Sequence, residues 1–120
     1  MSDERQKIGK LGEDKAVEML KRKKYKILER NEENKYGELD IIALDGEEMV
    51  FVEVRSKTGV DFGLPEETVK YKKKRRLIRN AKRYIKYQNI NTSYRIDVIG
   101  IIFNKKKNVK RIKHYKNITL

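Results

Sequence analysis

The sequence predicts a single α/β domain, residues 1–120, in which helices flank a mixed central β-sheet. Two segments, residues 3–24 and 66–88, repeat apolar residues at helical spacing, and five shorter segments are typical of strands. The expected order is therefore α-β-β-β-α-β-β. A helix between two strands favours a parallel pair, whereas an Asp-Gly turn favours an antiparallel one, so the sheet is expected to contain both.

The first helix is expected over residues 3–24 because its apolar residues fall on one arc. The short strand YKILERN follows at residues 25–31. A single apolar face on an otherwise charged helix predicts that this face packs against the sheet. The arc consists of Ile8, Gly12, Ala16, Met19 and Leu20.

The next two strands lie in the stretch GELDIIALDGEEMVFVEVRSK, with a turn at Asp45-Gly46. Side chains alternate along a strand, so the number of residues in the turn decides which of them share a face. An odd number would separate the charged residues of the two strands. Any even number brings them to one face: Glu38, Asp40, Glu53 and Arg55.

The even case is favoured because it leaves the opposite face wholly apolar. A loop of four residues would place Asp40 opposite Glu53, and a loop of two would place Glu38 opposite Glu53. The apolar face would consist of Leu39, Ile41, Ala43, Val50, Val52 and Val54.

Asp40 and Glu53 lie within two of the most apolar segments of the chain. An unpaired buried carboxylate is unfavourable, and two explanations stay open. One is an ion pair between Glu38 and Arg55, with the other acids satisfied by solvent or backbone amides. The other is a divalent cation between Asp40 and Glu53, because Mg²⁺ prefers carboxylate oxygens and takes further ligands from substrate phosphate.

The second helix, expected over residues 66–88, is basic except along one apolar stripe, and the strands YRIDVIGIIF and NVKRIKHYK follow it. In these strands, Asp97 is expected to be a structural partner of Arg95, and His114 to be a surface polar group. The tyrosines of the helix, Tyr71, Tyr84 and Tyr87, are expected to pack rather than to stack on bases. The stripe consists of Leu77, Ala81, Tyr84 and Ile85.

The charge of the chain is divided between its halves. Residues 1–67 hold 13 Lys/Arg and 17 Asp/Glu, a net charge of −4, whereas residues 68–120 hold 18 Lys/Arg and one acid, a net charge of +17. Lysine-rich compositions also accompany life at high temperature, but a uniform bias would not segregate the charges. A nucleic acid is therefore the expected partner. The absence of cysteine, of a long apolar run and of a signal-peptide pattern predicts a cytoplasmic protein without membrane contact.

Five motifs occur in order over nearly the whole chain: Gly9-x-x-Gly12-Glu13-x-x-Ala16, Asn31, Gly37-Glu38-Leu39-Asp40-Ile41-Ile42-Ala43, Val50-Phe51-Val52-Glu53-Val54-Arg55 and Arg95-Ile96-Asp97. Together they resemble the YraN-like family of small bacterial proteins. The resemblance implies a restriction-endonuclease-like fold of the PD-(D/E)xK superfamily, similar to Holliday-junction resolvases. It thereby implies a metal-dependent endonuclease that hydrolyses phosphodiester bonds of branched or structured DNA.

The same resemblance implies that Asp40 and Glu53 bind Mg²⁺ or Mn²⁺, with help from Glu13 of the first helix. Arg55 stands where the superfamily has its motif lysine. Arginine can stabilise charge but is a poor proton shuttle, so a nearby lysine is expected to complete the site. The candidates are Lys57, Lys70 and Lys73, of which Lys73 matches a family lysine.

Cations on the second helix and on the strand before it are expected to bind phosphates, which positions a substrate without reading its sequence. Recognition of shape is thus expected, with DNA preferred over RNA. If the likeness to the resolvases extends to assembly, a homodimer would place two sites on one branched substrate. The alternative is a non-catalytic protein that binds DNA or RNA on the same fold. The expected phosphate-binding residues are Lys57, Lys70, Lys72, Lys74, Arg75, Arg76, Arg79 and Arg83.

Overall fold

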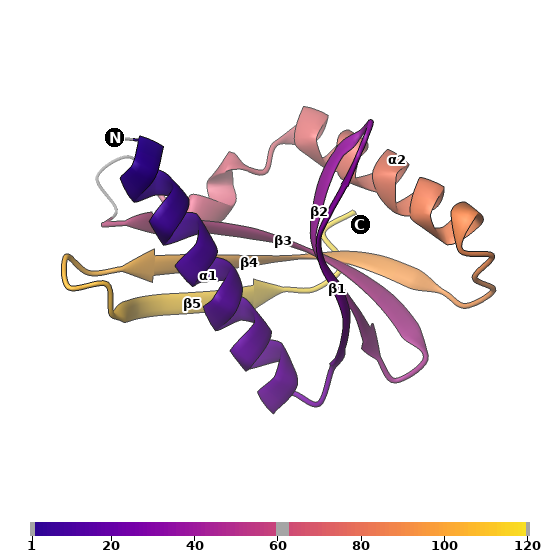
Figure 1. Cartoon of the computed structure of the whole chain (residues 1–120), viewed down its shortest axis with the longest axis horizontal. Coiled ribbons are helices and arrows are strands. Elements are labelled where there is room, and N and C mark those ends of the chain that lie inside the picture. Colours follow the sequence, from indigo (N-terminus) through magenta and orange to yellow (C-terminus); the bar gives the residue numbers. More distant parts are fainter. Residues whose placement is uncertain (1, 60–62, 120) are drawn as a thin grey trace.

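The computed structural model describes residues 2–59 and 63–119, and its helices and strands follow the predicted order (Figure 1). Within those ranges, no helix combines the length and the apolar character needed to cross a bilayer. The predicted α/β class is confirmed, and the arrangement is consistent with a nuclease-like fold. The elements are α1 (Ser2–Arg22), β1 (Lys26–Asn34), β2 (Gly37–Asp45), β3 (Glu48–Thr58), the 3₁₀ turn η1 (Pro65–Thr68), α2 (Tyr71–Tyr87), β4 (Tyr94–Phe103) and β5 (Val109–Tyr115).

The strands form one sheet in the order β1-β2-β3-β4-β5. β3 and β4 are parallel, and the other neighbouring pairs are antiparallel. The chain passes through α2 between β3 and β4, as a parallel connection requires. The prediction of a mixed sheet is therefore confirmed.

The two helices cover opposite faces of this sheet, because neighbouring residues of each central strand alternate between two apolar clusters. Ile41, Val50, Val52 and Ile99 pack beneath α1. Phe51 and other residues of the opposite parity pack against α2. Both predicted apolar stripes are buried: Ile8, Ala16 and Leu20 on α1, and Leu77, Ala81 and Tyr84 on α2.

The contact between α1 and β3 is close because Gly12 has no side chain. A Cβ atom at this position would lie 2.5 Å from Ser56 Oγ. Ser56 Oγ is itself fixed, since it donates a hydrogen bond to the carbonyl oxygen of Ile8 at 3.2 Å. The glycine of the predicted arc therefore sets how near the helix lies to the sheet.

Two predicted boundaries are wrong. The second helix does not begin at Glu66: residues 65–68 form the 3₁₀ turn, and Lys70 is extended (φ −95°, ψ −179°), so α2 begins at Tyr71. β1 does not end at residue 31 but continues to Asn34, because it stays paired with β2 as far as the Asn34–Gly37 pair. Pairing across the hairpin extends a strand that is too polar to be recognised alone.

Leu39 lies on the other face of the sheet from the one predicted. It is 2% exposed and belongs to the cluster under α2, whereas its expected companion Ile41 lies under α1. The described pairing of β2 with β3 stops at Ile41–Val52, and beyond it β2 pairs only with β1. A two-stranded ribbon twists more strongly than a full sheet, so alternation along β2 no longer predicts the face. Figure 1 shows this ribbon rising out of the sheet toward α2.

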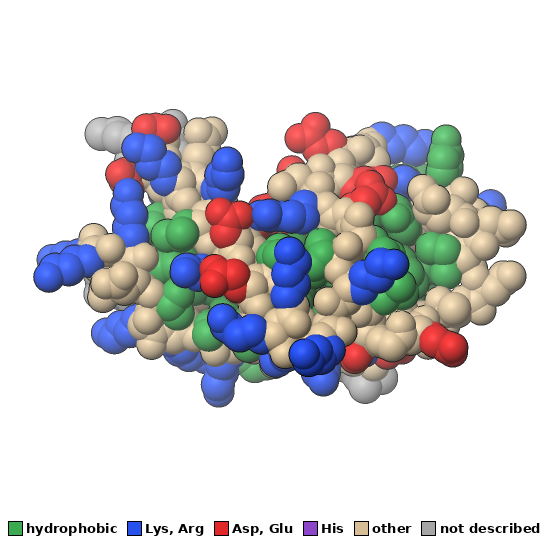
Figure 2. All heavy atoms as spheres, turned by 60° about the horizontal axis from the view of Figure 1, so that its bottom comes forward, with side chains coloured by type: hydrophobic (Ala, Val, Ile, Leu, Met, Phe, Trp, Pro, Cys, Tyr) green, Lys and Arg blue, Asp and Glu red, His purple; other side chains and the backbone are tan. Residues whose placement is uncertain are grey.

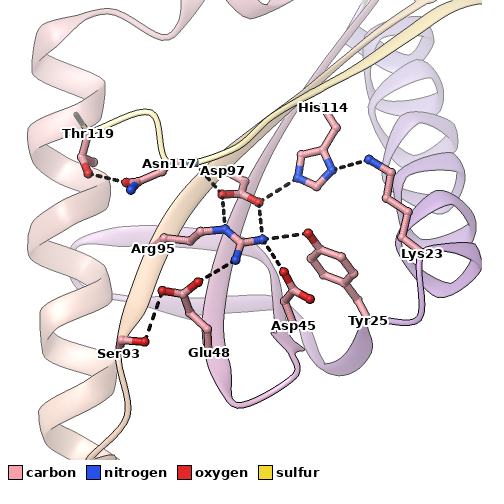
Figure 3. A network of polar contacts seen from close by, with 10 residues as sticks. All are labelled: Lys23, Tyr25, Asp45, Glu48, Ser93, Arg95, Asp97, His114, Asn117 and Thr119. Atoms are coloured by element: carbon pink, nitrogen blue, oxygen red, sulfur yellow. Dashed lines mark hydrogen bonds and ion pairs between the residues drawn. The ribbon is translucent and has the colours of Figure 1, made fainter.

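A polar network lies where the β2–β3 turn, the start of β4 and the end of β5 meet (Figure 3). Arg95 contacts Asp97 (Nε to Oδ1, 3.0 Å), Glu48 (Nη1 to Oε1, 2.7 Å) and Asp45 (Nη2 to Oδ2, 3.0 Å). Burial raises the pKa of Asp97, but hydrogen bonds from His114, Asn117 and Arg95 outweigh it, and the net pKa is lowered. The structural pairing of Asp97 with Arg95 is confirmed.

The prediction that His114 is a surface group is wrong. Its side chain is 1% exposed, and its Nε2 lies 2.7 Å from Asp97 Oδ2. The Lys23 ammonium lies 2.9 Å from its Nδ1, which makes Nδ1 the acceptor and Nε2 the donor. Pairing of β5 with β4 turns the ring inward, and a lysine-rich neighbourhood in sequence gives no sign of that.

Candidate metal centre

The β2–β3 hairpin brings the predicted acidic residues together. Asp45 pairs with Glu48 across the turn Gly46-Glu47, and Ile41 pairs with Val52, so one further step of the register faces Asp40 toward Glu53. Gly46 has φ +64°, a conformation that favours glycine at the first central position of such a turn. The prediction of an even number of residues in the turn is confirmed. Leu44 pairs with Met49, as a loop of four residues from Asp45 to Glu48 requires. Asp45 and Glu48 also pair with each other, so only Gly46 and Glu47 lie outside the paired strands.

Two elements, α1 and β2, contribute carboxylates to one cluster. Glu13 of α1 and Glu38 and Asp40 of β2 each offer an oxygen within 4.8 Å of the others. Asn31 of β1 joins two of them, since its Nδ2 donates to Glu13 Oε1 at 2.7 Å and to Glu38 Oε1 at 2.8 Å. The helix glutamate therefore faces the sheet.

Glu53 lies at the inner side of this cluster and is 4% exposed. Its Oε2 is 3.1 Å from Arg55 Nη2 and 3.5 Å from Lys73 Nζ. Its Oε1 is buried without a hydrogen-bond partner. The predicted ion pair between Glu38 and Arg55 is not the one formed: the guanidinium of Arg55 lies on Glu53, and Glu38 accepts from Asn31 instead.

Crowding of carboxylates raises two pKa values in the cluster. Burial, followed by repulsion from Glu53, raises the pKa of Asp40 to about 8, although the Val54 amide donates to its Oδ2 at 2.9 Å. Burial is also the largest cause of the raised pKa of Glu13, which Glu38 reinforces. Asp40 therefore holds a proton at neutral pH when nothing else neutralises the cluster.

The residues present fit a hard divalent cation. The cluster offers only carboxylate oxygens as charged ligands, which Mg²⁺ and Mn²⁺ prefer. Among the described residues, the buried Oε1 of Glu53 accepts no hydrogen bond while Asp40 is ionised, so it is available to a cation. Glu13 and Asn31 line an open hollow of about 580 Å³ between α1 and β1, so solvent reaches the edge of the cluster.

The three lysines expected as candidates to accompany Arg55 lie in different places relative to the acids. Lys73, on the first turns of α2, reaches Glu53. Lys57 instead lines a hollow beside the N-terminal turns of α1. Lys70 precedes α2 and forms no ion pair among the described residues. Lys73 is the lysine that the structure brings to the acids.

The cations expected to bind phosphate do not share one face. Arg76 and Arg79 line hollows between α2 and the β1–β2 hairpin, whereas Lys74 lines a separate hollow with Glu66. Arg83 is half-buried and paired with Glu32 at 2.7 Å. Figure 2 likewise shows lysine and arginine side chains spread over one face with acidic side chains among them. The remaining predicted cations, Lys70, Lys72 and Arg75, are exposed.

Two residues of this region were not recognised as contacts from sequence. Asn31 carries φ +53° and bridges two carboxylates, and its only signal was its place in the family pattern. Tyr36 contributes to two hollows beside α2. Its position next to Gly37 marked a turn but gave no indication of what the turn would approach.

The fold and the cluster define a small α/β protein with a nuclease-like arrangement and a carboxylate centre beside two cations. The chain belongs to the family described as Uncharacterised protein family UPF0102, which matches residues 12–101. This confirms the resemblance to the YraN-like family. It is 46% identical over 120 residues to a UPF0102 protein of Desulforamulus reducens, covering 98% of both chains. It is 41% identical over 118 residues to one of Pelotomaculum thermopropionicum, covering 98% of both. A UPF0102 protein of Clostridioides difficile is 44% identical over 110 residues, 91% of this chain and 93% of that one.

Proposed function

We propose that the protein is a metal-dependent DNA endonuclease that hydrolyses phosphodiester bonds of branched or structured DNA. The observation that carries this proposal is the convergence of Glu13, Glu38 and Asp40 from two elements, with the buried Glu53 beside them. A structural ion-pair cluster would match acids with cations. Here three carboxylates lie within 4.8 Å of one another, and the buried Oε1 of Glu53 has no hydrogen-bond partner among the described residues.

In this proposal, Glu13, Asp40 and Glu53 hold Mg²⁺ or Mn²⁺, and Glu38 completes the cluster. The ion, when bound, supplies an activated water and neutralises charge on the scissile phosphate. Asp40 gives up its proton on binding, so affinity for the ion rises with pH up to about 8.

The two cations on Glu53 take different roles. The guanidinium of Arg55 stabilises the negative charge that develops on the phosphate. Lys73 can both stabilise charge and move a proton, which makes it the functional counterpart of the motif lysine. Its Nζ lies 3.5 Å from Glu53 Oε2, so it would lie close to a phosphate that an ion on these carboxylates holds.

Cleavage of a labelled panel tests the proposal. The panel contains linear duplex, single strand, flap, four-way junction and structured RNA, each incubated with Mn²⁺, Mg²⁺ or EDTA. We expect metal-dependent cleavage that Asp40→Asn and Glu53→Gln both abolish. In a parallel melting experiment, metal at about 100 times its Kd stabilises the wild type by about 2.7 kcal/mol and leaves Asp40→Asn unchanged.

The ion pairs on Glu53 favour a second candidate, a non-catalytic protein that binds DNA or RNA. Arg55 and Lys73 already neutralise this acid without any ion. Under this alternative, metal does not change the melting temperature, and the wild type and both variants bind the panel equally without cutting it. The two candidates therefore give opposite results in the same pair of assays.

A further inference from the structure

A basic groove runs between the turn of the β1–β2 hairpin and α2, and it lies outside the acidic cluster. Two adjoining hollows, of about 520 and 360 Å³, share Tyr36 and Arg79 as lining residues. Figure 1 shows the hairpin rising to this side of the molecule, where α2 lies. We call this surface the hairpin groove; it is formed by Tyr36, Arg76, Arg79, Lys82, Lys86 and Tyr87.

The cations of the hairpin groove are available to a ligand. α2 contains no acidic residue. Within the described ranges, none of Arg76, Arg79, Lys82 and Lys86 lies within 4.0 Å of a carboxylate, and all four are exposed. The neighbouring acid Glu32 is already paired with Arg83. The groove thus presents concentrated positive charge, which attracts a polyanion.

Aromatic rings lie among these cations. Tyr87 is 82% exposed at the C-terminal end of α2, contrary to the expectation that it would pack. Tyr36, half-buried at the hairpin turn, has the Lys35 ammonium 5.3 Å from its ring centroid. Tyrosine rings beside phosphate-binding cations are the combination by which proteins hold unpaired bases, since every base has a face that can stack. A duplex keeps its bases stacked inside and would leave such rings unused.

The hairpin groove leads to the carboxylates. Tyr36 is two residues before Glu38 of the acidic cluster, and Lys73 precedes Arg76 by about one turn of α2. From Lys73 to Tyr87, α2 extends about 21 Å. A strand bound along this length would reach from the acidic cluster to Tyr87.

We propose that the hairpin groove binds single-stranded DNA, with bases on Tyr36 and Tyr87 and phosphates on Arg76, Arg79, Lys82 and Lys86. The inference rests on the proposed nuclease function, because the bound strand is then an unpaired arm of the substrate that leads to the acidic cluster. It adds what the cluster alone does not specify: a requirement for an unpaired segment beside the cleaved bond.

Fluorescence anisotropy of a labelled twelve-nucleotide oligothymidylate in EDTA tests binding without any metal or cleavage. We expect tighter binding of this strand than of a duplex of equal length. Tyr36→Ala and Tyr87→Ala should each weaken binding about tenfold, which corresponds to about 1.4 kcal/mol. Tyr36→Phe should retain affinity within about twofold, because stacking does not need the hydroxyl. Arg79→Ala should reduce the slope of log K against log salt by about 0.7.

Tyr71→Ala is the matched control, because Tyr71 is 71% exposed on the same helix but lines neither hollow. The proposal would be overturned if Tyr71→Ala lost as much affinity as the groove variants, or if both groove variants kept the wild-type affinity. It would also be overturned if the duplex bound as tightly as the single strand. Equal or tighter binding of oligouridylate would overturn the assignment to DNA. Intact groove binding with no cleavage of any substrate would count against the nuclease alone. Metal-dependent cleavage that is unchanged in Tyr36→Ala and Tyr87→Ala would count against the groove alone.

Discussion

Replacement of Asp40 by asparagine should change how stability depends on pH. The pKa of Asp40 is raised from 3.8 to about 8 in the folded protein, chiefly by burial and by Glu53. Between these two pH values the folded state keeps a proton that the unfolded state has lost, so the carboxyl group destabilises the fold increasingly as pH rises. Asparagine is nearly isosteric, can still accept from the Val54 amide and does not titrate.

The structure gives the magnitude of this effect. Each pH unit inside the window contributes up to about 1.4 kcal/mol, so the stability of Asp40→Asn relative to wild type should rise by up to about 2.7 kcal/mol from pH 5 to pH 7. It should level off above about pH 8, where Asp40 is ionised in both states. Titrating groups that are distant from Asp40, such as Asp97, are common to the two proteins and largely cancel in the difference.

Urea denaturation followed by circular dichroism at pH 5, 6, 7 and 8, with EDTA present, measures the difference. Asp3→Asn serves as the control, because Asp3 lies on the exposed first turn of α1. Its stability should follow wild type at every pH. Parallel curves for wild type and Asp40→Asn would refute the reasoning that Asp40 is a crowded, protonated carboxyl group.

Three further substitutions probe the site and its support. Lys73→Ala should lower the cleavage rate by about 10²–10³, the usual effect of losing one group that stabilises transition-state charge, while metal still raises the melting temperature. Arg95→Ala should lower the free energy of unfolding by about 3–5 kcal/mol in urea, because it leaves Asp97 buried with a lost ion partner. Gly12→Ala should destabilise by about 1–3 kcal/mol, since its Cβ would meet Ser56 Oγ.

Matched variants separate these effects from general damage. Lys70→Ala should lower cleavage much less than Lys73→Ala, and equal losses at both lysines would contradict the role given to Lys73. Arg22→Ala, on an exposed turn, should change stability by less than about 0.5 kcal/mol. Gly9→Ala, whose Cβ would meet nothing within 4 Å, should stabilise α1 by up to about 1 kcal/mol. Destabilisation at both glycines would show that space at Gly12 is not the cause.

Most of the fold was predictable because the signals for it are local. Helical spacing of apolar residues located α1 and α2, and alternation located β2, β3 and β4. The even turn indicated which residues share a face, and the observed register then selected Asp40 over Glu38 as the neighbour of Glu53. The α2 start at Tyr71 was missed because the extended backbone at Lys70 follows a 3₁₀ turn that has helix-like composition.

The candidate site was predictable only in part. Alternation of side chains along a strand predicts shared faces over two to four residues, so it correctly placed Glu53 and Arg55 together. It gave no information on Asn31, which meets Glu13 from 18 residues away in the chain. The choice of Lys73 over Lys57 and Lys70 likewise depended on where α2 begins and how it crosses the sheet.

The sequence by itself thus determined the element order, the even turn of the hairpin, the division of charge and the position of Asp40 and Glu53 within apolar segments. Only the tertiary structure decided that Leu39 turns toward α2, that His114 is buried against Asp97, and that Tyr36 approaches α2. Local patterns record which side of one strand or helix is apolar. Sheet twist and helix placement depend on the packing of every element at once, so they set the contacts between residues that are distant in the chain.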